Sequence, residues 1–243
     1  MNGSVIASFD RAASGYGACA PVQAAMAAWL AEWLPESREG RALEIGAGSG
    51  LFTEKILDWP GGVTATDISP AMCAVGRQFL PQAKWSVMAA ESPLAGPWDW
   101  IFSSSMLQWV RAPEQVFSDW RGCLVPGGRM LAGVFVEGSL SELRSVCGGF
   151  APLEWRSSDL WRGYLEQAGF RMIRDETALR MFAYDSAREL LRTLHGVGAA
   201  PVRHFSAGQL RRVLREYETD FGRPEGGVRA SWMFYRFEVE RVT

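Results

Sequence analysis

The sequence has little histidine and little cysteine, and both shortages narrow what the chain can do. Its 243 residues include two histidines, His195 and His204, and four cysteines that lie far apart without a CxxC spacing. Zinc sites need several such ligands at close spacing, so we expect no metal site. Four scattered thiols fit a reducing compartment.

Lysine, net charge and long apolar runs are also scarce. Only Lys55 and Lys84 are lysines, and the formal net charge is −2. A chain with this charge balance lacks the overall positive field that would attract nucleic acid. No apolar run approaches the length of a membrane span, and the N-terminal residues lack the basic and apolar regions of a signal peptide. We therefore expect a soluble cytoplasmic protein without nucleic-acid or membrane partners, and a monomer.

Strand and helix patterns alternate along the chain. Short β-rich runs are expected at 41–45, 63–67, 84–87, 98–103, 129–135, 170–179 and 230–242. Helices are expected at 51–59, 69–79, 112–124, 159–168, 186–194 and 206–217. This alternation predicts parallel βαβ units with right-handed crossovers, in an α/β fold with a doubly wound, mostly parallel sheet.

A single domain over 1–243 is the expected organisation. No repeat, low-complexity tract or convincing linker divides the sequence. N-terminal helices in 1–35 are expected over the ligand, and inserted helices in 139–168 and 184–222 are expected to form a cap over the substrate.

A glycine-rich turn is the strongest functional signal. Gly46, Gly48 and Gly50 follow a short apolar strand and precede a helical stretch. Ligands of open α/β sheets bind at the carboxyl ends of strands, where this turn lies. Asp67 ends the next strand, 17 residues after Gly50. An acidic residue at this position can accept hydrogen bonds from both ribose hydroxyls of a nucleotide. The glycines alone are a weak signal. Together with the preceding strand, the following helical stretch and Asp67, they indicate a nucleoside-binding site.

Two ligand classes compete for this turn. The dinucleotide-binding fingerprint GxGxxG has Gly or Ala at its sixth position, where this chain has Leu51. Glu44, two residues before the first glycine, suits a cation such as the ammonium of a methionine moiety. These residues favour S-adenosylmethionine over a dinucleotide.

Several segments resemble those of class I S-adenosylmethionine-dependent methyltransferases, whose sheets are Rossmann-like and seven-stranded. They are 44–50, 67–72, 90–94, 98–104 and 124–128. Within that superfamily the chain most resembles the malonyl-acyl-carrier-protein O-methyltransferases of biotin synthesis. That closer similarity is carried by 9–13 with Tyr16 and Gln23, by 107–109, by 138–143 and by 191–199.

The resemblance implies a cofactor site. Its expected members are Glu44, Gly46, Ala47, Gly48, Gly50, Asp67, Ile68, Met72, Ala90, Glu91 and Ser103. The chain departs from the family at Ala47, where Cys is frequent, and at Ala89, where an Asp commonly contacts adenine. Base recognition is then expected to rest on the backbone or on the neighbours of Glu91.

The implied reaction is an in-line attack of a malonyl carboxylate oxygen on the methyl group of the sulfonium. That carboxylate is already ionised at neutral pH, so no general base is required. Arg144 is the expected carboxylate clamp, and Tyr16 is expected to close over the methionine end or the substrate. An ordinary surface arginine and a core aromatic would look the same in sequence.

An acidic acyl-carrier protein bearing the malonyl group is the implied partner. The arginines expected to steer it are Arg188, Arg192, Arg203, Arg211, Arg212 and Arg215. His195 stands where the family often has Lys. Two other functions stay open: methylation of a free small acid, as in trans-aconitate-type methyltransferases, and a regulator that binds the cofactor without turnover.

Overall fold

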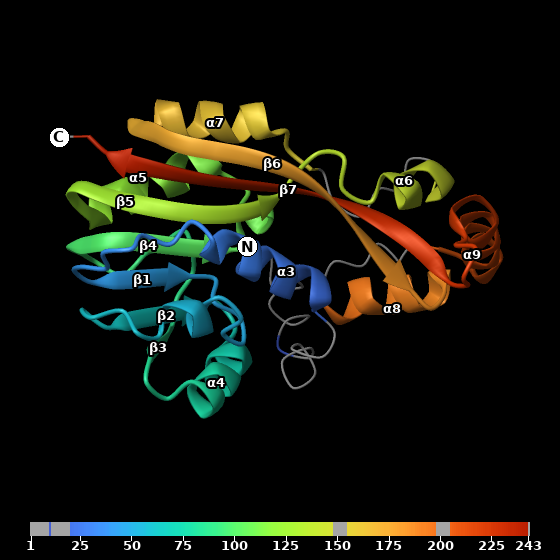
Figure 1. Ribbon diagram of the computed structural model, residues 1–243, viewed down its shortest axis with the longest axis horizontal. Coiled ribbons are helices and arrows are strands. Elements are labelled where there is room, and N and C mark those ends of the chain that lie inside the picture. The colour runs from blue at the N-terminus through green and yellow to red at the C-terminus, as the bar shows by residue number, and fades with distance from the viewer. Residues whose placement is uncertain (1–9, 11–19, 148–154, 198–204, 243) are drawn as a thin grey trace.

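A seven-stranded sheet forms the centre of the protein (Figure 1). The computed structural model describes residues 10, 20–147, 155–197 and 205–242. The strands are β1 (Ala42–Ile45), β2 (Val63–Asp67), β3 (Lys84–Val87), β4 (Trp98–Ser104), β5 (Leu124–Phe135), β6 (Phe170–Tyr184) and β7 (Val228–Arg241). Their order is β3-β2-β1-β4-β5-β7-β6; β1 to β5 pair in parallel, and β7 is antiparallel to both β5 and β6. The predicted α/β sheet is confirmed.

Helices cover both faces of the sheet. The helices α3 (Pro21–Ala31), α4 (Pro70–Phe79) and the 3₁₀ helix η2 (Thr53–Ile56) share one hydrophobic cluster with Ala42 of β1. The helices α5 (Pro113–Cys123) and α7 (Ser158–Gln167) share another with Leu43. Successive strand residues point to opposite faces, and all four residues of β1 are buried because both faces are covered.

Local signals set the boundaries of α4. Ser69 caps the helix through its Oγ, which accepts from the Met72 N–H at 3.1 Å, and Pro70 is the first helical residue. The sequence predicted this start and the end at Phe79, and the structure agrees.

The predicted helix over 51–59 is wrong. Only Thr53–Ile56 is helical, as a 3₁₀ turn flanked by other turns. Thr53, Ile56 and Trp59 are all buried. Their spacing of three residues matches the 3₁₀ period, in which side chains three positions apart eclipse on one side.

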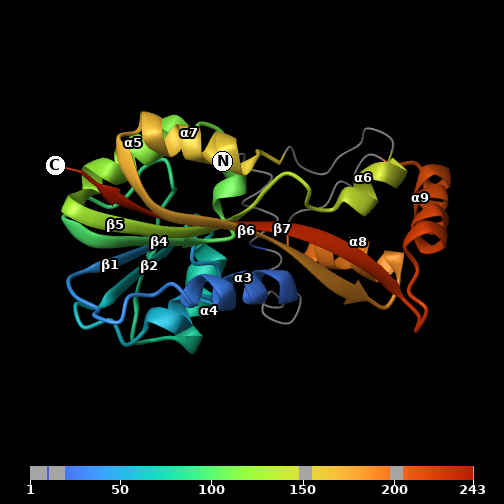
Figure 2. The same ribbon diagram turned by 45° about the horizontal axis from the view of Figure 1, so that its top comes forward.

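A cap stands beyond the carboxyl ends of the parallel strands (Figure 2). Residues 228–233 of β7 pair with β6 beyond the end of the β5 ladder. This extension carries α8 (Ala187–Gly196) and α9 (Ala207–Phe221), and α6 (Ser141–Cys147) packs against α9 and β7. The buried Glu142 on α6 accepts from the Ser231 N–H at 3.0 Å, which ties the cap to β7. In the described part of the chain, no helix is long and apolar enough to cross a membrane.

The helix α7 does not belong to this cap, although the sequence expectation for 139–168 included it. It packs on β6 and α5, with Trp161 only 1% exposed and its ring 6.0 Å from that of Phe117. Trp161 and Leu165 lie four residues apart on one helix face, and burial of that face against α5 places the helix on the sheet.

Stacked side chains hold α3 against the sheet. The Arg236 guanidinium of β7 lies between the rings of Trp29 and Trp33, 4.1 and 4.2 Å from their centroids. It also donates to Glu176 at 2.6 Å. This buried arginine has both carboxylate and aromatic partners, which is how such a charge is tolerated inside a protein.

Candidate active site

The glycine turn after β1 brings backbone close to the carboxyl edge of the sheet. Gly46, Gly48 and Gly50 have φ angles of 76°, 57° and 104°, which glycine adopts without strain. The Gly46 N–H donates to the Thr66 carbonyl at 2.8 Å and fixes the turn to β2. A Cβ on Gly46 would lie 2.2 Å from Met106 Cγ, so only glycine leaves room for the segment after β4.

Glu44 places a buried carboxyl beneath this turn. The residue is 1% exposed, and its Oε2 accepts from the Thr53 hydroxyl at 2.6 Å. Burial raises the pKa of the Glu44 carboxyl to about 8, the Thr53 hydroxyl partly opposes this, and the charge of Asp67 adds to it. The carboxyl therefore keeps its proton near neutral pH, and a cation beside it would favour the ionised form.

Asp67 joins the glycine turn to the end of β2. Its Oδ2 accepts from the Gly48 N–H at 2.9 Å and its Oδ1 from the Ser69 N–H at 2.8 Å. Burial raises the pKa of the Asp67 carboxyl, and these two N–H groups oppose the rise. A carboxylate offers about four acceptor positions, so both oxygens retain capacity for a ligand hydroxyl.

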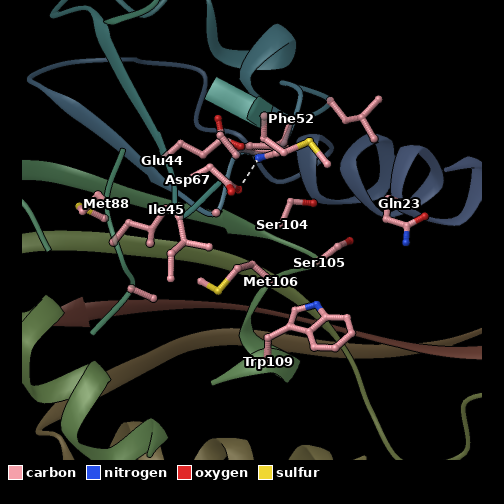
Figure 3. A pocket seen from close by; sticks show the side chains of 17 residues that line it. Gln23, Glu44, Ile45, Phe52, Asp67, Met88, Ser104, Ser105, Met106 and Trp109 are labelled. Carbon is pink, nitrogen blue, oxygen red and sulfur yellow. Dashed lines mark hydrogen bonds between the residues drawn. The ribbon is translucent and has the colours of Figure 1, made fainter. Parts of the chain in front are cut away.

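A cavity of about 680 Å³, part of it open to solvent, lies over these groups (Figure 3). Its lining residues are Gln23, Glu44, Ile45, Gly46, Ala47, Gly48, Leu51, Phe52, Asp67, Ile68, Met72, Met88, Ala90, Ser104, Ser105, Met106 and Trp109. Two carboxyls among apolar walls suit a ligand that combines a cation, hydroxyls and a flat ring. No group of three potential metal ligands occurs among the residues that the structure describes.

Comparison with known proteins agrees with this geometry. A family model described as a methyltransferase domain matches residues 43–132. The malonyl-[acyl-carrier protein] O-methyltransferase of Paenibacillus sp. (strain JDR-2) is 31% identical, over 90% of this chain and 92% of that protein. The protein of the same name from Chlorobium phaeovibrioides is 30% identical, over 90% and 89%. The chain belongs to this methyltransferase family.

Solved structures share the fold of the methyltransferase. The YcgJ protein of Bacillus subtilis superposes with a TM-score of 0.68 at 13% identity, covering 90% of this chain and 99% of that one. A Haemonchus contortus phosphoethanolamine N-methyltransferase 2, solved with S-adenosyl-L-methionine, gives 0.55 at 19% identity, over 89% and 52%. At such identities the likeness concerns the fold alone.

Most of the predicted cofactor residues of the methyltransferase lie at the cavity. Those that line it are Glu44, Gly46, Ala47, Gly48, Asp67, Ile68, Met72 and Ala90. Gly50, Glu91 and Ser103 do not. A Cβ on Gly50 would meet Leu80 at 2.6 Å, and the Ser103 hydroxyl donates to the Ile45 carbonyl at 2.9 Å, so both have packing or backbone roles.

The described lining of the cavity includes neither of the two predicted catalytic residues. Tyr16 lies outside the described residues. Arg144 is exposed on α6 and does not line the cavity. Their roles toward the acceptor stay predictions.

Sequence reasoning missed part of the lining, namely Phe52, Met88, Ser104, Ser105 and Met106. Met88 directly follows β3, and Ser105 and Met106 directly follow β4. Their position after a parallel strand was the available signal, since ligands bind at that edge.

The buried carboxyl of Glu44 makes a prediction about pH. Its pKa of about 8 exceeds the ordinary 4.5, so the folded methyltransferase keeps a proton that the unfolded chain releases. Between these values the contribution of Glu44 to the unfolding free energy falls as pH rises, by up to about 1.4 kcal/mol per pH unit. Urea unfolding of the cofactor-free protein from pH 5 to 8 should show this slope, and Glu44→Gln should remove it. Parallel pH profiles for the two proteins would contradict the assignment.

Proposed function

We propose that the protein transfers the methyl group of S-adenosylmethionine to the free carboxylate of a malonyl-acyl-carrier-protein thioester, as a step of biotin synthesis. The observation that carries this proposal is the extent of the similarity to malonyl-[acyl-carrier protein] O-methyltransferases. It covers 90% of the chain, so it extends well beyond residues 43–132, which the methyltransferase-domain model matches, and into the cap. The cap is the part of such a fold in which acceptor specificity is expected to reside.

The residues of the cavity fit this cofactor. Glu44 would receive its ammonium and Asp67 its ribose hydroxyls, while Met88 and Ala90 would flank the base. When bound, S-adenosylmethionine supplies an electrophilic methyl group on a sulfonium sulfur. The chain's own contribution is to hold the glycine turn open and to keep the lining dry.

Acceptor activation needs no proton transfer at this site. A malonyl carboxylate is ionised at neutral pH, and no histidine or lysine is found among the described lining residues. Catalysis then rests on aligning the two reactants, which can contribute about 7–11 kcal/mol in the best cases. Arg144 and Tyr16 are proposed to contact the acceptor carboxylate.

The cap offers a basic surface for the carrier protein. An open groove between α8 and α9 is lined by Arg188, Leu191, Arg192, His195, Leu210 and Leu214. Arg211, Arg212 and Arg215 are exposed on α9, whereas Arg203 lies outside the described residues. Positive charge on the cap would accelerate the encounter with an acidic carrier protein and favour it over other partners. We therefore assign carrier docking to this surface.

Arg188→Glu should raise the KM for malonyl-carrier protein about tenfold, because it places a negative charge before an acidic partner. The KM for a free malonyl thioester should stay constant, and the effect should shrink at high salt. Lys84→Glu, with the same charge change at the start of β3, is the matched control. Equal effects of both variants would contradict docking in the groove.

The function itself is tested by methyl transfer. The purified protein is incubated with S-adenosylmethionine and, in parallel, malonyl-carrier protein and free di- and tricarboxylates. Turnover of the carrier-bound malonyl group, with growth of methyltransferase-deficient cells without biotin, is the expected result. Turnover of free acids alone would assign the trans-aconitate-type alternative, and cofactor binding with no product would assign a regulator.

A further inference from the structure

The serine directly after β4 is held in a strained backbone conformation. Ser105 has a φ of 59°, in the left-handed region that non-glycine residues avoid. Its N–H donates to the Gly133 carbonyl at 2.8 Å, and its own carbonyl accepts from Gln108 Nε2 at 2.6 Å. These two bonds fix the residue on both sides, so the surrounding fold maintains the strain.

The hydroxyl of Ser105 contributes no hydrogen bond to this fold. Its Oγ is buried and has no partner among the residues that the structure describes. Burying an unpaired hydroxyl costs free energy, and so does the left-handed backbone. Folding is therefore penalised twice at Ser105, and unexplained costs of this kind point to a ligand that uses the group.

The position of Ser105 indicates which ligand. It lines the cavity beside Ser104 and Met106 (Figure 3). In the sheet, β1 lies between β2 and β4. A cofactor held by Asp67 after β2 and by the glycine turn after β1 leaves the β4 side of the cavity to the second reactant.

We propose that the Ser105 hydroxyl donates a hydrogen bond to the acceptor and determines its orientation. On the proposed function, on which this inference rests, the bonded atom is one oxygen of the malonyl carboxylate. The other oxygen accepts no hydrogen bond from Ser105 and is the one that attacks the methyl group. Gln108 is the positioning residue, because its amide holds the Ser105 carbonyl and hence the direction of the hydroxyl.

Two variants separate this role from a structural one. Ser105→Ala and Ser105→Gly both remove the hydroxyl, but only glycine also relieves the backbone strain. We expect both to raise the KM for malonyl-carrier protein about tenfold or more, with the Kd for S-adenosylmethionine unchanged within twofold. Ser105→Gly should unfold at a higher temperature than Ser105→Ala. If KM rises in Ser105→Gly, the more stable of the two variants, damage to the fold does not explain the rise.

The result that overturns the inference is an unchanged KM in both variants. A parallel rise in cofactor Kd would also overturn it, because Ser105 would then belong to the cofactor site. The wild-type protein supplies the separate control: absence of turnover with malonyl-carrier protein would refute the proposed function itself. If the wild type methylates another acid instead, the KM ratio of variant to wild type for that acid tests the contact.

Discussion

Gly46→Ala is expected to lower the affinity for S-adenosylmethionine at least 100-fold and the unfolding free energy by about 3 kcal/mol or more. Its φ of 76° costs an alanine about 1–2 kcal/mol. The new Cβ would also lie 2.2 Å from Met106 Cγ and 2.5 Å from Met106 Cβ. Because Met106 Cβ is attached directly to its backbone, no rotamer change relieves the contact. The glycine turn or the end of β4 must move, and both line the cavity.

Gly62→Ala is the matched control for this experiment. Gly62 has a φ of 78°, and a Cβ there would have no atom within 4 Å. This variant therefore isolates the backbone cost, about 1–2 kcal/mol, and should bind the cofactor normally in calorimetry. Adding Met106→Ala to Gly46→Ala should recover part of the lost stability, since the two positions are coupled. If Gly46→Ala behaves like Gly62→Ala, the close approach of Met106 has no role in the site.

The elements with local signals were the predictable ones. The cap Ser69 and the following Pro70 give the start of α4, and the run at 84–87 gives β3 without error. The positions of the glycine turn and of Asp67 at the ends of their strands were likewise predicted, because the pattern of alternating elements already places those strand ends. Short parallel strands leave little freedom in where such residues meet.

Features set by tertiary contacts could not be predicted. The turn at η2 forms where the Thr53 hydroxyl donates a hydrogen bond to the buried Glu44. The helix propensities of residues 51–59 carry no information about that contact. The apolar face of α7 would suit a cap or a sheet equally, and the fit against Phe117 of α5 decides between them. The strain at Ser105 arises from bonds to β5 and Gln108, so the sequence shows only a serine.

Asp67→Ala is expected to weaken S-adenosylmethionine binding about 100-fold or more. Two contributions add, because the carboxylate has two tasks. Ribose hydroxyls would donate to a charged acceptor, and such bonds contribute about 1.5–3 kcal/mol each. The same carboxylate accepts from the N–H groups of Gly48 and Ser69, so its loss leaves two backbone donors unpaired and loosens the glycine turn. Calorimetric titration of the cofactor measures the sum.

Two further variants separate these contributions. Asp67→Asn keeps the shape and one oxygen, but its amide nitrogen would face the N–H of Gly48 or Ser69, so an intermediate loss is expected. Asp99→Ala removes a carboxylate that accepts a hydrogen bond of 2.7 Å from the Arg41 N–H and does not line the cavity. It should cost comparable stability while leaving cofactor affinity unchanged. Should Asp99→Ala weaken binding as much as Asp67→Ala, the loss would report general destabilisation, and the ribose contact would have to be abandoned.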